Sequence, residues 1–230
     1  MDTAFQQILR EVAVQLCDLG TELSAELPSS APSLVFPAKR PGKFGAVAVR
    51  MSEAEARTLF AIALSRRSVP FAIEVPTSQQ YSFKGATPMS ARVDLVAYGP
   101  RGDSIGTLRR SLGIEFKAHN PPPESIRKDL EKLMREGHDG LWFHVLRNID
   151  SVTLDALLAK FRRGLEDLAS ARAACRAQLT IALVVLEKRL FLFRTVDSQQ
   201  DWSSALRLGY VVRRGRVEVS DDNGWSVEAL

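Results

Sequence analysis

Hydrophobic and polar positions follow two periods along the chain, and these periods predict its helices and strands. Four segments carry apolar residues every three or four positions and are predicted helices: 3–26, 52–67, 124–136 and 152–176. Short apolar runs bounded by Gly, Pro or Asn are predicted strands: 71–75, 91–98, 111–118, 141–146, 179–186, 190–196 and a small hairpin at 211–219. This order predicts an α/β fold, a mixed central sheet flanked by helices.

The first helix differs in charge from the segment that follows it. Residues 2–26 carry five acidic side chains and one arginine, whereas residues 36–70 carry seven basic and two acidic side chains. Between them the sequence LPSSAPS at 27–33 breaks the helical period and predicts a linker. We therefore expect a helical extension and linker at 1–35, which could mediate a homodimer, and a working α/β domain at 36–230 that ends in a β-hairpin.

Composition excludes several classes of protein. With 45% hydrophobic and 25% charged residues, the 230-residue chain has the composition of an ordinary globular protein. Its two cysteines are far apart in sequence, which disfavours a disulfide framework and fits a reducing cytoplasm. We see no basic and apolar leader and no run of about 20 apolar residues, so we expect no membrane association. The net charge of +4 is compatible with nucleic acid without requiring it.

Charged residues interrupt the second and third predicted strands, where apolar side chains are usual. Asp94 lies in the second, and Glu115 and Lys117 lie in the third. Because strand side chains alternate between faces, Glu115 and Lys117 share one face while Ile114 and Phe116 share the other. Carboxylates are the ligands that Mg²⁺ prefers, so Asp94, Glu115 and the Phe116 carbonyl could hold this ion. Lys117 could orient an attacking water or neutralise charge that develops on a phosphorane.

A simpler interpretation is an edge strand whose charged side chains are solvated. The Glu115-Phe116-Lys117 tripeptide is the only Asp/Glu-x-Lys sequence in the chain, and it falls on a predicted strand. We therefore favour the metal-dependent reaction, in which two carboxylates and a lysine meet a phosphodiester.

With these residues in this order, the sequence resembles the PD-(D/E)XK superfamily of restriction-endonuclease-like nucleases. The resemblance covers roughly residues 50–195, and Val93 stands where the family motif has proline. It implies an αβββαβ core, Mg²⁺ or Mn²⁺ as the cofactor and cleavage of nucleic acid, most commonly DNA. Asp94 and Glu115 would be the acids of the motif and Lys117 its catalytic lysine.

Several members of this superfamily complete the metal site with a glutamate from the first core helix. Glu55 and Glu53 are the candidates here, and we favour Glu55 for a catalytic role. Glu55 also fits another interpretation, because Ser52 followed three residues later by glutamate is a capping-box pattern. Glu74, at the end of the first core strand, could approach the site or lie in solvent.

Lysines outside the motif are candidates for nucleic-acid contacts. Lys128 and Lys132 are four residues apart and share a face of the helix that follows the motif, although a solvated face is an equally good interpretation. Lys84 follows the aromatic residues Tyr81 and Phe83 in a predicted loop. The three histidines lack zinc-ligand spacing, and neither a P-loop nor a dinucleotide fingerprint occurs. We expect a Mg²⁺-dependent endonuclease of bacterial defence or DNA processing; the alternative is an inactive nuclease-fold module that binds nucleic acid or protein.

Overall fold

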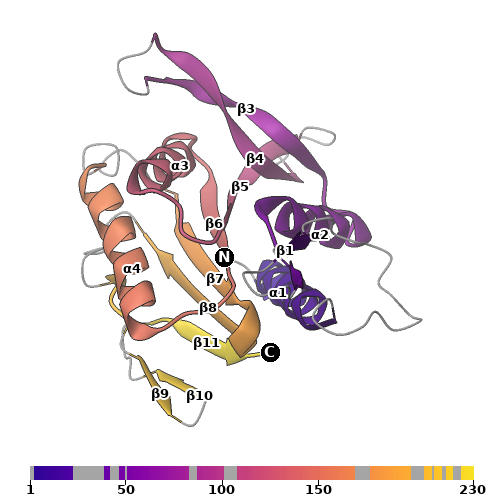
Figure 1. Ribbon diagram of the computed structural model, residues 1–230. Coiled ribbons are helices and arrows are strands. Elements are labelled where there is room, and N and C mark those ends of the chain that lie inside the picture. Colours follow the sequence, from indigo (N-terminus) through magenta and orange to yellow (C-terminus); the bar gives the residue numbers. More distant parts are fainter. Residues whose placement is uncertain are drawn as a thin grey trace.

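A seven-stranded mixed sheet with helices on both faces forms the centre of the molecule (Figure 1). The computed structural model describes residues 3–22, 39–41, 47–49, 51–82, 87–100, 108–168, 177–197, 205–208, 210–213, 216–219 and 224–230. The predicted α/β class with a mixed, helix-flanked sheet is confirmed.

The described helices and strands follow the predicted order, except that the sequence pattern did not predict the strands at 39–41, 47–49 and 226–229. The helices are α1 (Thr3–Glu22), α2 (Glu53–Arg66), α3 (Pro123–Arg135), α4 (Ser151–Glu166) and the short 3₁₀ helix η1 (Leu186–Lys188). The strands of the main sheet are β3 (Phe71–Tyr81), β4 (Met89–Pro100), β5 (Leu108–Ala118), β6 (Asp139–Leu146), β7 (Leu179–Val185), β8 (Leu190–Val196) and β11 (Ser226–Ala229). Two small hairpins are formed by β1 (Lys39–Pro41) with β2 (Val47–Val49) and by β9 (Tyr210–Arg213) with β10 (Arg216–Val219).

Strand order in the sheet is β11-β8-β7-β6-β5-β4-β3. The β5–β6 and β6–β7 pairs are parallel, and the other pairs are antiparallel. The two parallel connections run through α3 and α4, as such crossovers require. The sheet is therefore parallel at its centre, where β5 and β6 are covered by helices on both faces.

Side-chain alternation divides the core into two layers. Along β6, Leu141 and Phe143 pack with α1 and α2, whereas Trp142 and Leu146 pack with α3 and α4. Figure 1 shows the two helix pairs on opposite sides of the sheet. Phe116 of β5 belongs to the α1–α2 layer, so the neighbouring positions of β5 point toward α3.

The N-terminal helix α1 is part of this core and not a separate extension. Leu9, Val12 and Leu16 are fully buried against α2 and the sheet, and Arg10 forms an ion pair with Glu228 of β11. The apolar side of α1 is thus buried within the chain, and the homodimer expected from the charge of this helix stays a prediction. The expected linker at 27–33 lies outside the described residues.

Pro76 does not end β3, contrary to the sequence-based expectation. The strand continues to Tyr81 with a shift in register between Pro76 and Gln80. Because β3 is an edge strand, a proline without an N–H can lie in it at little cost. As a result β3 and β4 extend beyond the rest of the sheet as a two-stranded ribbon (Figure 1). Among the described residues, no helix combines the length and the hydropathy that crossing a bilayer requires.

Candidate active site

The site lies where β4 and β5 stop pairing with each other. The last main-chain pair of their ladder at this end is Leu95 with Ile114. One step further, the Phe116 N–H donates to Oδ2 of Asp94 at 2.8 Å. A side-chain carboxylate thus takes the place of a main-chain acceptor, and Asp94 is fixed at the point of divergence.

Glu115 lies on a central strand, because β5 is paired with β4 on one side and β6 on the other. Its side chain is only 1% exposed. The interpretation of Glu115 as a solvated charge on an edge strand is therefore wrong. A carboxylate at this depth needs a partner to remain ionised.

Helix α3 supplies those partners in a chain of ion pairs. Lys132 Nζ lies 2.6 Å from Glu115 Oε1 and 2.8 Å from Asp129 Oδ1. The other oxygen of Asp129 lies 2.9 Å from Lys117 Nζ, and Lys132 also donates to the Arg92 carbonyl at 2.9 Å. Both lysines are therefore held by one carboxylate, and the structure brings Asp94, Glu115 and Lys117 into a single cluster with α3.

Burial sets the ionisation of this cluster. Desolvation raises the pKa of Asp94, although the Phe116 N–H and Lys117 oppose that rise. Desolvation also raises the pKa of Glu115 well above its ordinary value, and the Asp129 charge adds to the rise. Burial disfavours the charged form of Lys117, but the Asp129 carboxylate prevails and raises the pKa of this lysine. Lys117 is thus protonated, and the negative charge of the neighbouring carboxylates is not fully balanced by positive charge.

Helix α2 contributes Glu53 to the same site. A cavity of about 360 Å³ lies at the start of this helix, and it is lined by Ser52, Glu53, Ala54, Arg57, Glu74, Asp94 and Phe116. Burial raises the pKa of Glu53, the charge of Lys117 lowers it, and the charge of Asp94 raises it. The main chain of Ala118 also lowers the pKa of Glu53. Glu53 is therefore coupled to both strands of the site.

Glu55 occupies a different place. Its carboxylate accepts hydrogen bonds from the main-chain N–H of Ser52, at 2.6 Å, and from the Ser52 hydroxyl. The hydroxyl of Ser52 in turn accepts a hydrogen bond from the Ala54 N–H, which completes a capping box at the start of α2. The structure thus places the favoured glutamate, Glu55, at the helix cap and brings its neighbour Glu53 to the cluster.

One wall of the cavity is an ion pair. Arg57 of α2 lies 2.5 Å from Glu74 of β3, and both residues line the cavity. Glu74 adopts a positive φ of 54°, a conformation that non-glycine residues adopt infrequently. Glu74 therefore approaches the site, but it is paired with an arginine and does not add to the unpaired negative charge.

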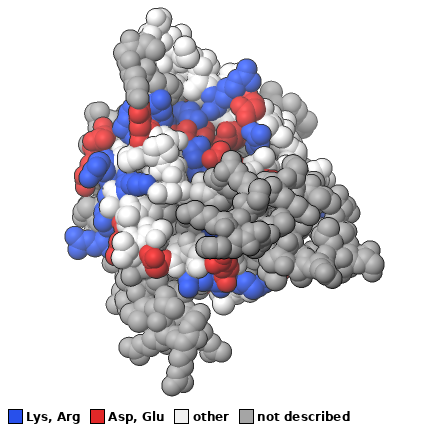
Figure 2. Space-filling view, viewed as in Figure 1, with Lys and Arg blue, Asp and Glu red and all other residues white. Residues whose placement is uncertain are grey.

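The three lysines that were candidates for nucleic-acid contacts, Lys132, Lys128 and Lys84, differ in where they lie. Lys132 is only 8% exposed and lies within the cluster, so it cannot be the surface contact that its helical spacing suggested. Lys128 lies on the outer side of α3 in an i, i+4 ion pair with Glu124. Lys84 lies outside the described residues. Figure 2 shows acidic and basic side chains interleaved in the upper part of this face and not one continuous basic surface.

Sequence reasoning missed Asp129. It lies three residues before Lys132 on α3, a spacing that joins side chains on one helix face, but only the lysine spacing on this helix was considered. Among the described residues, no group of three or more His, Cys, Asp or Glu side chains is arranged as a metal cluster. Lysine amines lie between the carboxylates of Glu115 and Asp129 instead.

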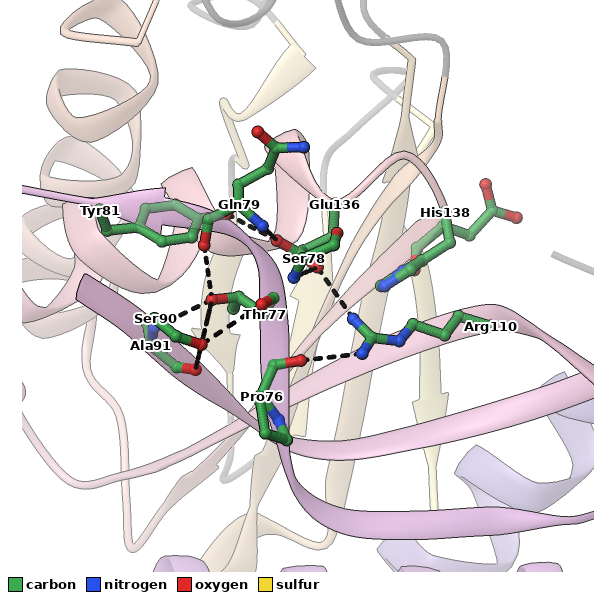
Figure 3. A network of polar contacts seen from close by, with 11 residues as sticks. Pro76, Thr77, Ser78, Gln79, Tyr81, Ser90, Ala91, Arg110, Glu136 and His138 are labelled. Carbon is green, nitrogen blue, oxygen red and sulfur yellow. Dashed lines mark hydrogen bonds and ion pairs between the residues drawn. The ribbon is translucent and has the colours of Figure 1, made fainter. Parts of the chain in front are cut away.

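A second polar cluster joins the end of α3 to the β3–β4 ribbon (Figure 3). Oε2 of Glu136 accepts hydrogen bonds from the N–H and the hydroxyl of Ser78, both at 2.7 Å. Its Oε1 accepts from the Gln79 N–H and the Tyr81 hydroxyl, while Arg110 forms an ion pair at 3.0 Å. Glu136 thus holds the irregular part of β3, where the register shifts, against the core.

Comparison of the chain with protein-family models, with curated proteins and with solved structures found no match. The geometry of the site is therefore the basis for a proposed function.

Proposed function

We propose that this protein is a metal-dependent nuclease that hydrolyses phosphodiester bonds in DNA on a restriction-endonuclease-like PD-(D/E)XK core. The observation that carries the proposal is the convergence of Asp94, Glu115 and Lys117 where β4 and β5 diverge. The order of elements from α2 through β3, β4, β5 and α3 to β6 agrees with the αβββαβ core that the resemblance implies.

The residues of the site fit a divalent cation. Four carboxylates, those of Glu53, Asp94, Glu115 and Asp129, face two ammonium groups, so the cluster has an excess of negative charge. Burial raises the pKa values of Glu53, Asp94 and Glu115 and so disfavours their ionised forms, which a further cation nearby would favour. Carboxylate oxygens are hard ligands of the type that Mg²⁺ and Mn²⁺ take.

Asp94, Glu115 and Glu53 would hold the ion, and the Phe116 carbonyl would be a further ligand. In a strand, the N–H and C=O of one residue point to the same side, and the N–H of Phe116 points to Asp94. Bound there, Mg²⁺ would supply Lewis acidity to a phosphodiester oxygen.

Lys117 acts as a hydrogen-bond donor and a positive charge in this proposal, not as a general base. Asp129 keeps its amine protonated. An ammonium fixed by a helix can orient the attacking water and stabilise the negative charge that develops on the phosphorane. The cavity beside Asp94 offers the space that a phosphodiester group needs to enter.

Cleavage of plasmid DNA and of single-stranded DNA with Mg²⁺, Mn²⁺ or EDTA tests the proposal. We expect the wild-type protein to cut DNA with Mg²⁺ or Mn²⁺, and we expect EDTA to abolish this cleavage. The Asp94→Asn and Glu115→Gln variants should not cut. Glu124→Gln is the matched control: this glutamate lies in the first turn of α3, where it forms an i, i+4 ion pair with Lys128, and its loss should not change the rate. If the purified wild-type protein cuts neither substrate with either metal, the proposal is wrong.

The alternative is a nuclease-fold module that binds nucleic acid or protein without cutting. One observation favours it: both lysine amines of the cluster are already held by carboxylates. Retention of DNA in the presence of Mg²⁺ without cleavage, with an affinity that falls as salt rises, would decide for this module.

A further inference from the structure

Lys132 occupies a cage of oxygen atoms beside the carboxylates of the site. We propose that its ammonium is a permanent resident of this cage and takes the place of a second divalent cation, so that the site binds one metal ion and not two. This inference rests on the proposed function, and it names the metal stoichiometry of the same site.

The contacts of Lys132 are those of a cation with oxygen ligands. Its Nζ lies 2.6 Å from Glu115 Oε1, 2.8 Å from Asp129 Oδ1 and 2.9 Å from the Arg92 carbonyl. An ammonium group has three N–H donors, and three oxygens surround this one at 2.6 to 2.9 Å. The oxygens come from β4, β5 and α3, so the cage joins three elements.

Displacement of Lys132 by a metal ion would take its ammonium away from the three oxygens that it contacts in a buried place. The lysine is 8% exposed and the Arg92 carbonyl belongs to the main chain of a paired strand. Asp129 is also fixed by Lys117 on its other oxygen. Since a buried charge that loses its partner is strongly unfavourable, the amine is more stable in the cage than outside it.

The charge of the cluster also fits a single divalent ion. The carboxylates of Glu53, Asp94, Glu115 and Asp129 exceed the ammonium groups of Lys117 and Lys132 by two charges. One Mg²⁺ balances this excess, and a second would leave the buried cluster positively charged.

Titration of the wild-type protein with Mn²⁺ alone, without DNA, tests the inference. Isothermal calorimetry and electron paramagnetic resonance should both give one bound Mn²⁺ per chain. Lys132→Met keeps an unbranched side chain but removes the ammonium, and it should bind two. Lys128→Met is the matched control on the outer face of α3 and should still bind one.

A second measurement uses the wild-type protein and does not depend on the folding of the variant. The side-chain ammonium resonance of Lys132, assigned by NMR, should persist when Mg²⁺ saturates the site. Two Mn²⁺ ions on the wild type, one on Lys132→Met, or release of the Lys132 amine by Mg²⁺ would each overturn the inference and leave the proposed function standing. A wild-type protein that binds no Mn²⁺ would overturn both.

Discussion

Lys117 Nζ lies 2.9 Å from Oδ2 of Asp129, so the lysine of β5 is held by a residue of α3. The Asp129 carboxylate both aims the amine and raises its pKa. An isolated lysine at this depth would instead tend to lose its proton, because burial penalises the charged form. The pair therefore defines what Lys117 can do: it can donate hydrogen bonds and stabilise negative charge.

Lys117→Ala should lower the rate of cleavage by roughly 10²- to 10³-fold, the usual effect of removing one donor to a developing negative charge. DNA retention should be preserved, since the amine is largely buried between β5 and α3. Single-turnover cleavage and a filter-binding assay on the same preparation separate the two. A variant that cuts at the wild-type rate would exclude Lys117 from the reaction.

Asp129→Asn should change the pH dependence of the cleavage rate. Loss of the Asp129 charge removes the main influence that raises the pKa of Lys117. The amine then loses its proton at a lower pH, so activity should decline earlier on the alkaline side than in the wild type. Rates between pH 7 and 10 measure this shift. An unchanged alkaline limb would show that Asp129 does not control the protonation of Lys117.

Glu53→Gln and Glu55→Gln form a matched pair of substitutions on one turn of α2. Glu53→Gln should weaken Mn²⁺ binding at least roughly 10-fold, because it removes a charge coupled to Asp94 and Lys117. Glu55→Gln should change stability by about 1 kcal/mol or less, since glutamine also completes a capping box. Calorimetric titration and urea unfolding provide the readouts. The reverse pattern would assign the metal to Glu55.

Asp94→Asn should stabilise the metal-free protein at neutral pH. Burial raises the pKa of Asp94 in the folded state, so its ionisation opposes folding above that pKa. Below its ordinary pKa the group is protonated in both states, and the variant should lose its advantage there. Thermal melts at pH 7 and below pH 4 show the difference. Saturating Mg²⁺ should reverse the order at pH 7, because it binds the folded wild type, adding about 2.7 kcal/mol at 100 times Kd.

The sequence predicted β4 and β5 as strands and singled out their charged residues, because a charged side chain within an apolar strand can be recognised from the local sequence. It could not show that α3 would deliver both Asp129 and Lys132 to the site, since that depends on how the helix packs on the sheet. The preference for Glu55 arose because capping and ligation use the same residue types at the start of a helix. Capping the helix and binding the metal require the carboxylate to point in different directions. The folded structure gives that direction, and the sequence does not.

The position of α1 also could not be predicted from the sequence. Its acidic surface and apolar stripe are equally consistent with a dimer interface and with a helix packed on the sheet. Leu9, Val12 and Leu16 are buried within the chain because α1 packs beside α2 on that face of the sheet, and no local pattern encodes this packing.

His144 should make the protein sensitive to acid. This residue is fully buried on β6, and burial lowers its pKa to about 4 although Nε2 is bonded to the His119 carbonyl at 2.7 Å. The folded state therefore resists protonation that the unfolded state accepts near pH 6.5. Stability should be complete above pH 6.5 and should fall by on the order of 3 kcal/mol toward pH 4.

Urea unfolding from pH 7 to 4 measures this loss, and NMR titration of the His144 ring measures its pKa directly. His144→Gln should flatten the pH dependence in this window while it lowers stability at pH 7. A His144 ring that titrates near 6.5 in the folded protein would contradict the assignment.

Glu136 should be more important for stability than its place at the end of α3 suggests. Its side chain is fully buried, and its two oxygens accept hydrogen bonds from Ser78, Gln79 and Tyr81. Removal of the charge in Glu136→Gln replaces one acceptor oxygen with an amide that faces donors. We expect a loss of about 2 kcal/mol in the free energy of unfolding.

Glu131→Gln is the control, because among the described residues Glu131 forms i, i+4 ion pairs with Arg127 and Arg135 of its own helix. Such pairs contribute less than about 1 kcal/mol, so the control should unfold close to the wild type. The hydrogen bonds also lower the pKa of Glu136 against the effect of its burial. Its contribution should therefore be present above the ordinary glutamate pKa and be lost as the pH falls below it. Equal unfolding of the two variants at pH 7 would show that the β3 irregularity is held by other contacts.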